Sequence, residues 1–423
     1  MNSDVRRLGI DSSKKSYSST LTLLIFMIQF IGLFLLAVKV NEQFNIKFMI
    51  LTVSFIVVSL LSNIYLPKIT QGDNALVFIV NMLYTIGLMM IIRLNVDRGM
   101  QHIIWYLLSM AVAMVIYAIL SKWMYIFKNK FIFYFIVTLA TFIVTLTLGR
   151  ATGGAKNWIK LPGDITIQLS EFAKISFIFM IASFYGDYDN ISSEKLGKYY
   201  LNIATYIFIA LFFLQGELGT AMVFFAVFLF SSFVYEKNYK LLFINIILAV
   251  IGLFVAYKMF DHIKVRFDIW LDPWADYKTK GYQIIQGLFA ISSGGLFGSG
   301  LGLGSPNLIP VASSDFIVPA IIEEMGIFMG ISVVLLFVIL IYKGIKIALV
   351  NQDVFFSSLA FGTSIVFAAQ AIVMFGGVLK LIPLTGITTP FMSYGGSATL
   401  SSFILLMVLQ FTSSERRHQY EKF

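Results

Sequence analysis

The sequence predicts an all-α, polytopic membrane protein with about twelve transmembrane helices and one long extracytoplasmic loop before the tenth. Of its 423 residues, 58% are hydrophobic and 13% are charged, whereas soluble chains carry about a quarter charged residues. Apolar runs recur from Leu21 to Gln410, close to the ~20 residues that cross a ~30 Å hydrocarbon core. This composition excludes disordered, collagen-like and disulfide-framework proteins. The chain has no cysteine, and its three histidines are far apart in sequence, so thiol chemistry is excluded and a histidine metal cluster is not indicated.

Each predicted helix corresponds to one apolar run. The first five runs are plain and typical of lipid-facing helices, the next four precede a long polar stretch, and the last three follow it. Seven of the eight prolines lie at or after Pro162, so irregular backbone, which at membrane depth must be buried or line a cavity, is concentrated in the later helices. The predicted helices cover residues 21–38, 48–66, 75–92, 103–120, 131–148, 169–185, 200–215, 217–235, 241–260, 316–342, 354–379 and 391–411.

The charge distribution indicates the topology. An even number of helices places both termini on one side, and lysine and arginine are more frequent in the segments that lie in the cytoplasm if both termini do. Arg6 and Arg7 precede the first helix and no small-residue cleavage site follows it, so a retained helix is predicted rather than a signal peptide. The net charge of +9 is spread between apolar runs, which fits anionic lipid head groups and not nucleic acid.

Three polar or glycine-rich stretches fall on the outer side in this topology. They cover residues 149–170, 261–315 and 384–397, and 8 of the 31 glycines lie between Gly281 and Gly304. Function in proteins is carried disproportionately by loops on a rigid scaffold. We therefore expect a site that opens outwards, built from the C-terminal two-thirds of the chain.

Ionisable residues at helix ends are candidates for that site, because charge is costly in hydrocarbon. Glu171 and Lys174 lie three positions apart at a helix start, so they share a face and can pair, either as substrate contacts or as a structural ion pair. Ser170 is placed to cap the same helix. Glu217 lies in a short turn between two helices, where a structural polar contact is favoured.

Further carboxylates lie in and before the tenth predicted helix. Asp315 opens this helix, and the adjacent Glu323 and Glu324 lie inside it, where they need partners or raised pKa values. We expect these three groups to have supporting roles. Lys380, at the outer end of the next helix, is expected to extend its amine to the interface.

The long outer stretch carries the strongest chemical signal. Carboxylates, cations and aromatic residues alternate from Lys264 to Gln283, which suits an anionic substrate handled beside a general base. The alternative is a solvated loop whose Asp-Pro and glycine residues only form turns. The glycines fit neither of the common nucleotide-binding patterns, so nucleotide-driven chemistry is not indicated.

Seven short motifs carry a family resemblance. They are Gly154-Ala-Lys-Asn-Trp-Ile159, Gln168-Leu-Ser-Glu-Phe-Ala-Lys174, Leu271-Asp-Pro-Trp-Ala-Asp276, Gly281-Tyr-Gln-Ile-Ile-Gln286, Ser314-Asp-Phe-Ile317, Glu323-Glu-Met-Gly326, and Ile382-Pro-Leu-Thr-Gly386 with Pro390-Phe-Met-Ser-Tyr-Gly-Gly-Ser397. In this order and spacing they resemble the motifs of the shape, elongation, division and sporulation (SEDS) family, to which RodA and FtsW belong. The resemblance covers about residues 135–412.

The resemblance implies a peptidoglycan glycosyltransferase of the bacterial plasma membrane. Such an enzyme polymerises lipid II outside the cytoplasm and works with a class B penicillin-binding transpeptidase. The family's essential aspartate falls on Asp276, and its paired basic residues fall on Lys264 and Arg266. The other residues that we expect at the substrate are Lys156, Gln168, Glu171, Lys174, Gln283 and Ser393.

The implied reaction needs one proton acceptor. An acceptor sugar hydroxyl loses its proton as it attacks the anomeric carbon of the donor, and lipid diphosphate leaves. Diphosphate is already a good leaving group, so it needs positive charge and not a second carboxylic acid as in glycoside hydrolysis. Asp276 is the candidate base, Lys264 and Arg266 are the first candidates to neutralise the diphosphate, and Lys156 or Lys174 is a further candidate. No cofactor is evident, and the sequence leaves open a divalent cation such as Mg²⁺ or Mn²⁺.

The chain departs from the family pattern at several positions. Glu217 stands where relatives usually have aspartate, Leu169 replaces a proline, and Met374 and Lys380 replace asparagine and glycine. The family core has ten helices, so the first two here are predicted to be an addition, for which helix packing is favoured over docking of a partner's helix. The predicted organisation is a cytoplasmic N-terminal tail (1–20), N-terminal helices (21–130), a catalytic membrane core (131–412) with its outer loop (261–315), and a cytoplasmic C-terminal tail (413–423).

Two other functions remain open at this point. A lipid II flippase would expose membrane charges to both sides in turn and tolerate loss of one outer carboxylate. A silent scaffold would only recruit a transpeptidase. For the enzyme, we expect lipid tails to enter sideways through a groove among the sixth to twelfth helices, lined by helices broken near Pro319 and Pro390.

Overall fold

The fold is all-α and polytopic, as predicted. It is given by a computed structural model that describes residues 15–39, 46–152, 155–160, 166–194, 196–236 and 238–421. Most of the predicted N-terminal tail and Gly154 of the first motif lie outside these residues. Within them, eleven helices are long and apolar enough to cross a membrane. A further helix, α6 (Ser170–Gly186), has 17 residues, most of them buried, and corresponds to the sixth predicted span.

The long helices match the twelve predicted apolar runs. The largest differences are at α4, α13 and α15, which have 32, 34 and 26 residues because polar ends continue each helix beyond its apolar run. Besides α6, they are α1 (Lys15–Lys39), α2 (Ile46–Thr70), α3 (Asn74–Leu94), α4 (Val96–Phe127), α5 (Phe131–Leu148), α8 (Tyr200–Gln215), α9 (Leu218–Tyr235), α10 (Tyr239–Met259), α13 (Ile317–Val350), α14 (Val354–Val378) and α15 (Gly396–Glu421).

The polar stretches contain structure that the apolar pattern does not predict. The first forms a three-stranded antiparallel sheet in the order β1-β2-β3, in which Trp158 pairs with Gln168. The long outer stretch forms two helices and two short 3₁₀ turns. The elements of these two stretches are β1 (Arg150–Thr152), β2 (Ala155–Lys160), β3 (Thr166–Gln168), α11 (Asp261–Leu271), η5 (Pro273–Asp276), α12 (Tyr282–Gly294) and η6 (Pro306–Leu308). The connection between α6 and α8 adds α7 (Tyr188–Ser193) and η4 (Gly197–Tyr199).

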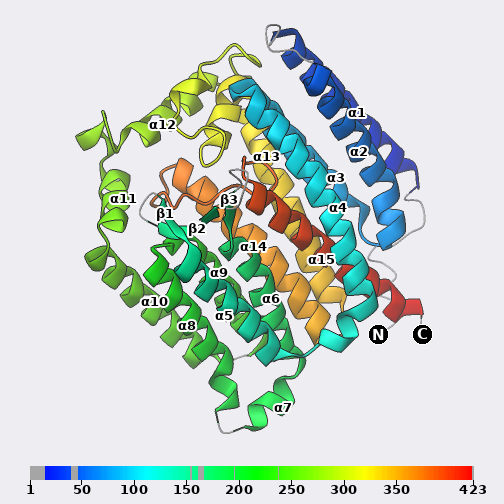
Figure 1. Cartoon of the computed structure of the whole chain (residues 1–423), viewed down its shortest axis with the longest axis vertical. Coiled ribbons are helices and arrows are strands. Elements are labelled where there is room, and N and C mark those ends of the chain that lie inside the picture. The colour runs from blue at the N-terminus through cyan, green and yellow to red at the C-terminus, as the bar shows by residue number, and fades with distance from the viewer. Residues whose placement is uncertain are drawn as a thin grey trace.

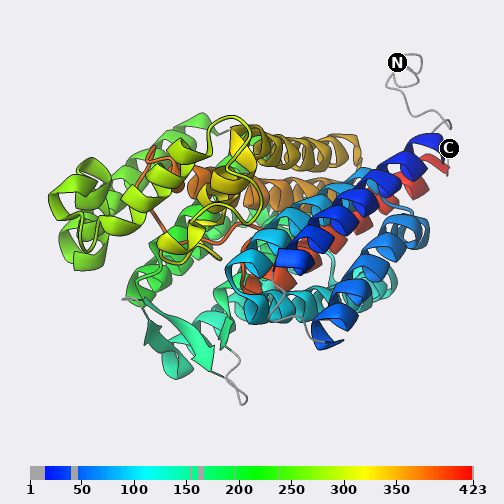
Figure 2. The ribbon, with the colours of Figure 1, turned by 90° about the horizontal axis from the view of Figure 1, so that it is seen from above.

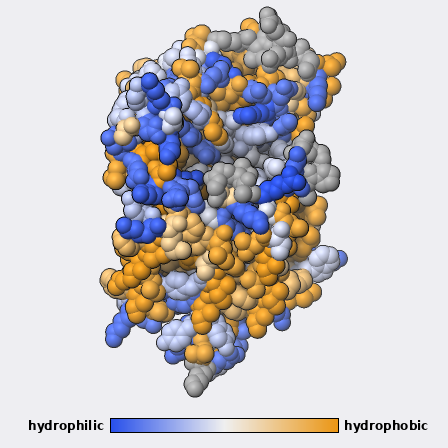
Figure 3. Space-filling model, turned by 60° about the vertical axis from the view of Figure 1, so that its left-hand side comes forward, coloured by the Kyte–Doolittle hydropathy of each residue, from blue (hydrophilic) through white to orange (hydrophobic). Residues whose placement is uncertain are grey.

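The helices form one bundle with a buried centre. Helices α3, α14 and α15 are mostly buried, whereas α1, α2 and α10 expose most of their apolar residues, as lipid-facing helices do. Helices α1 and α2 lie on the opposite side of the bundle from α11 and α12 in both ribbon views (Figures 1 and 2). On the face in Figure 3, hydrophobic side chains form a broad band and hydrophilic ones gather above it.

Helix α13 breaks at Gly326, whose φ of 82° and ψ of 170° are not helical. The break was predicted near Pro319, but that residue lies in the first turn of α13, where a missing N–H costs nothing. The chain is also non-helical around Pro390, since α14 ends at Val378 and α15 begins at Gly396. The predicted start of the last helix at residue 391 was therefore too early.

Hydrogen bonds between side chains join the two N-terminal helices to the rest of the bundle. The amide of Gln29 on α1 donates to the hydroxyls of Ser59 on α2 (2.8 Å) and Thr85 on α3 (2.9 Å). The amide of Asn81 on α3 donates to Asn63 on α2 (2.8 Å). Because all five side chains are buried, α1 and α2 are integral parts of the bundle.

Candidate functional site

A polar cavity of about 210 Å³ lies where the three predicted outer stretches meet. The sheet contributes Asn157 and Gln168, the long stretch contributes Arg266 and Asp315, and the third stretch contributes residues 385–388. Helices α6, α9 and α14 complete the wall. The predicted convergence of the three stretches is confirmed.

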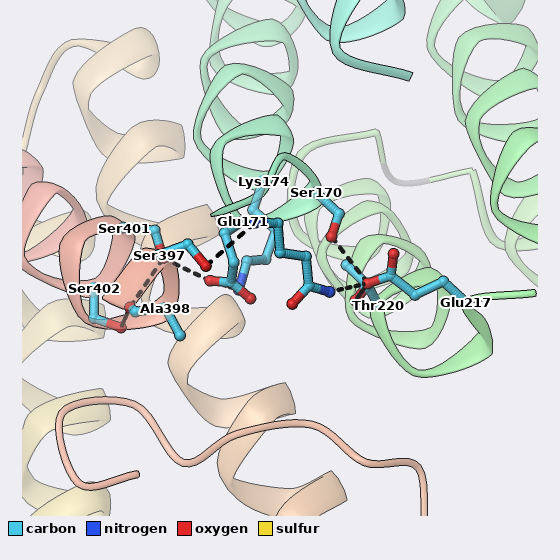
Figure 4. Close-up of polar contacts among 10 residues, drawn as sticks. Ser170, Glu171, Lys174, Glu217, Thr220, Ser397, Ala398, Ser401 and Ser402 are labelled. Carbon is cyan, nitrogen blue, oxygen red and sulfur yellow. Dashed lines mark hydrogen bonds and ion pairs between the residues drawn. The ribbon is translucent and has the colours of Figure 1, made fainter. Parts of the chain in front are cut away.

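Two charges from the start of α6 form an ion pair at this cavity. Lys174 Nζ lies 2.8 Å from Glu171 Oε2, and both side chains are buried. The hydroxyl of Ser401 on α15 donates to the same carboxylate oxygen (2.6 Å; Figure 4). The predicted pairing is confirmed, and its burial makes the pair costly to break.

Glu217 receives three hydrogen bonds on one oxygen. Gln168 Nε2 (2.7 Å), Ser170 Oγ (2.9 Å) and Thr220 Oγ1 all donate to Glu217 Oε1 (Figure 4). Burial, together with the charge of Glu171, raises the pKa of Glu217 above its ordinary value, although the three donors oppose this rise. The prediction that Ser170 caps α6 was wrong, because its hydroxyl points across to Glu217 and Leu169 is the capping residue.

Arg266 and Asp315, both from the long outer stretch, line the cavity and influence each other's charge. Arg266 Nη1 donates to the backbone oxygen of Thr385 (2.5 Å), which ties α11 to the third stretch. Burial raises the pKa of the Asp315 carboxyl, while a hydrogen bond from Ser314 and the guanidinium of Arg266 lower it. Burial also lowers the pKa of Arg266, and Asp315 partly offsets this.

The candidate base, Asp276, does not line the cavity. It is partly exposed in η5, where the hydroxyl of Thr279 donates to its Oδ1 and Gly281 N donates to its backbone oxygen (2.9 Å). The arm α11–η5–α12 carries Asp276 together with Arg266, which does line the cavity. Lys264 is exposed on α11 of the same arm.

Three further predicted substrate residues also lie outside the cavity lining. Lys156 Nζ donates to Leu146 O (2.7 Å) at the end of α5, and Gln283 Nε2 donates to Pro310 O (3.4 Å). Ser393 is buried, and its hydroxyl donates to Ser314 O (2.6 Å). These contacts join segments of the outer stretches to their neighbours.

Glu323 and Glu324 have partners, as predicted for buried carboxylates. Glu323 Oε1 accepts from the backbone N of Ser305 (2.6 Å), and Glu324 Oε2 accepts from that of Gly302 (2.6 Å). Arg93 Nε lies 3.0 Å from Glu324 Oε1. The two carboxylates therefore hold the glycine-rich segment before α13 and do not line the cavity.

Sequence reasoning missed three buried polar residues of the cavity wall. Asn157, Thr220 and Gln370 all line it and are buried. Thr220 carries a usable signal, because a residue three positions after Glu217 on a helix start faces the same side. Asn157 and Gln370 gave no such signal, since amides within an interfacial strand and an apolar helix are common in structural roles.

The cavity and fold define a multi-pass α-helical membrane protein with an internal polar site, formed where its polar connecting segments meet α6, α9 and α14. A family model described as a cell cycle protein, and named for FtsW, RodA and SpoVE, matches residues 74–418, from the start of α3 into α15. The chain belongs to this FtsW/RodA/SpoVE family, the SEDS family that the motifs indicated.

Curated relatives agree with this assignment, and solved structures share the fold. The peptidoglycan glycosyltransferase RodA of Mycobacterium leprae is 32% identical over 410 residues, covering 90% of this chain and 87% of the relative. Stage V sporulation protein E of Bacillus subtilis is 31% identical over 369 residues, covering 83% and 99%. A chain of a peptidoglycan synthase complex has the same fold, with a TM-score of 0.65 at 20% identity over 82% of this chain and 98% of that one. The RodA of Thermus thermophilus has a TM-score of 0.57 at 19% identity, with the same coverage.

Proposed function

We propose that this chain is a peptidoglycan glycosyltransferase that polymerises lipid II at the outer face of the bacterial plasma membrane. The observation that carries the proposal is the family match across the whole polar cavity and its arm, together with relatives named for this activity. The cavity and the α11–η5–α12 arm then lie outside the cytoplasm, and both termini lie inside it.

Asp276 is proposed as the general base. It takes the proton of the acceptor's sugar hydroxyl as that oxygen attacks the donor's anomeric carbon, and the bond to the lipid diphosphate breaks. Its place on an arm beside the cavity supports this role, because a partly exposed carboxylate with one hydroxyl donor can accept a proton. The exposed amine of Lys264 on the same arm can neutralise the departing diphosphate.

A divalent cation would assist the same departure. Within the described ranges, no group of three or more His, Cys, Asp or Glu side chains is placed to hold a metal ion. Magnesium commonly binds through one or two carboxylates together with substrate phosphates. If the reaction uses a cation, we expect it to arrive with the diphosphate and to be held by few protein ligands.

One experiment tests the function. The purified protein, alone and with its class B penicillin-binding transpeptidase, receives lipid II in detergent, and the products are separated by glycan length. Long strands are expected. The assay is run with and without added Mg²⁺ or Mn²⁺, which shows whether strand formation requires a divalent cation. Translocation of lipid II in liposomes without strand formation would favour a flippase. The absence of both strand formation and translocation would favour a scaffold.

A further inference from the structure

The cavity wall presents buried hydrogen-bond acceptors that no group in the described part of the chain satisfies. Glu217 Oε2, Gln370 Oε1 and Asn157 Oδ1 all lack a hydrogen-bond partner there. All three side chains are more than nine-tenths buried, with exposed fractions of 7%, 3% and 8%, and all three line the cavity. Buried polar atoms are nearly always paired, so three orphans around one cavity indicate a ligand that supplies donors.

Glu217 is the most informative of the three. Its Oε1 already accepts from Gln168, Ser170 and Thr220, which fixes the carboxyl group and leaves Oε2 as the free atom. An amide oxygen and nitrogen can exchange places by a flip, but both atoms of this carboxyl group are oxygens. The atom without a hydrogen-bond partner is therefore an oxygen, whichever way the carboxyl group is turned.

The cations of the cavity are already engaged. Lys174 pairs with Glu171 at 2.8 Å, and Arg266 donates to Thr385 O while facing Asp315. With Glu217, the cavity holds three carboxyl groups against two basic ones. A diphosphate offers only acceptors and negative charge, so it would meet unsatisfied acceptors and more acidic than basic side chains.

We propose that this cavity binds the sugar portion of the lipid-linked substrate, whose hydroxyl and acetamido N–H groups donate to Glu217 Oε2, Gln370 and Asn157, and that the diphosphate lies outside it. The proposal rests on the proposed function for the identity of the substrate. The volume of about 210 Å³ admits only a small part of a lipid-linked disaccharide. Trp158 adds an aromatic wall of the kind common in ligand sites.

The test compares two ligands that differ only in the sugar. One is farnesyl diphosphate, and the other is the same lipid diphosphate carrying the N-acetylglucosaminyl-N-acetylmuramyl disaccharide. In Glu217→Gln the three donors keep the amide oxygen at the Oε1 position, so an NH₂ group replaces the free acceptor without a change of shape. Binding to the full-length protein in detergent is measured at about pH 8, well above the ordinary carboxyl range, because burial raises the pKa of Glu217 and Oε2 is an acceptor only in the ionised form.

Glu217→Gln is expected to weaken binding of the sugar-bearing ligand about tenfold or more and to leave farnesyl diphosphate within about twofold, because one buried acceptor is lost. Glu236→Gln is the matched control: Glu236 caps the other end of α9, accepts from Tyr185, and does not line the cavity. It should change neither affinity. Gln370→Leu should also weaken binding of the sugar-bearing ligand alone. If Glu217→Gln fails to fold, the Gln370→Leu result tests the proposal.

Loss of farnesyl diphosphate binding in these variants, or an equal loss for both ligands, would overturn the proposal. Glycan synthesis by the wild type is assayed on the same preparation. If the wild type makes no strands but the variants lose affinity only for the sugar-bearing ligand, the proposed polymerase function is refuted and the proposed sugar site stands. If the wild type makes strands but the variants show no sugar-selective loss, the sugar site is refuted and the polymerase function stands.

Discussion

At the scale of single residues, the pairing of each polar atom separates the charged side chains that the sequence proposes for one role. Lys174, Arg266 and Lys264 are all candidates for neutralising diphosphate by sequence. In the structure the first is paired with Glu171 and the second with Thr385 O, whereas Lys264 is exposed. Lys264 is therefore the cation best placed to meet an incoming anion.

The raised pKa of Glu217 predicts a pH-dependent difference in stability. The folded state holds this proton more tightly than the unfolded state does, and the nearby charge of Glu171 adds to the effect. The contribution of Glu217 to wild-type stability should therefore fall as the pH rises from the ordinary carboxyl pKa of 4.5 to the raised pKa of the folded state. Glu217→Gln has no proton to lose there.

Thermal unfolding in detergent from about pH 5 to about pH 8 measures this difference. The melting temperature of Glu217→Gln, relative to the wild type, should increase with pH. A difference that stays constant or decreases would show that the folded protein does not favour the protonated carboxyl.

At the scale of elements, the break in α13 depends on Gly326. Its φ of 82° suits glycine, and a Cβ there would lie 2.3 Å from Leu296 O. Gly326→Ala should therefore destabilise the protein by at least ~1–3 kcal/mol, as measured by thermal or denaturant unfolding in detergent. Gly252→Ala is the control, because Gly252 lies inside α10 with nothing within 4 Å of the added Cβ. That variant should be neutral or up to ~1 kcal/mol more stable; equal effects would contradict the role of Gly326.

The sequence predicts the long helices well because hydrocarbon thickness and apolar length are tied to each other. It does not predict the sheet, α11 or α12, since these segments are too short or too polar to cross a membrane, and apolar length identifies only spanning helices. Among the site residues, the Glu171–Lys174 pair is local and was predicted. The donors to Glu217 come partly from residues 168–170, a contact across helices that spacing along the chain does not reveal.

At the scale of the whole molecule, the N-terminal helices contribute to stability through buried polar contacts. Deletion of residues 1–70 would leave Asn81 and Thr85 without the partners they have on α1 and α2. We expect lower yield and a lower melting temperature, with each lost interhelical hydrogen bond costing ~0.6–1.7 kcal/mol. A truncated chain as stable as the full one, but unable to pull down its transpeptidase, would instead favour a docking role for these helices.

The central claim is that Asp276 acts as the base of glycan polymerisation. The most direct measurement is the rate of strand formation from lipid II by Asp276→Asn, with Asp272→Asn as the matched control in the same arm. Asp272 is exposed, and its Oδ1 accepts from Trp274 N (3.0 Å). Asp276→Asn should lower the rate at least ~10²–10⁴-fold without loss of folded protein, and Asp272→Asn should stay near the wild-type rate. A wild-type rate in Asp276→Asn would contradict the account.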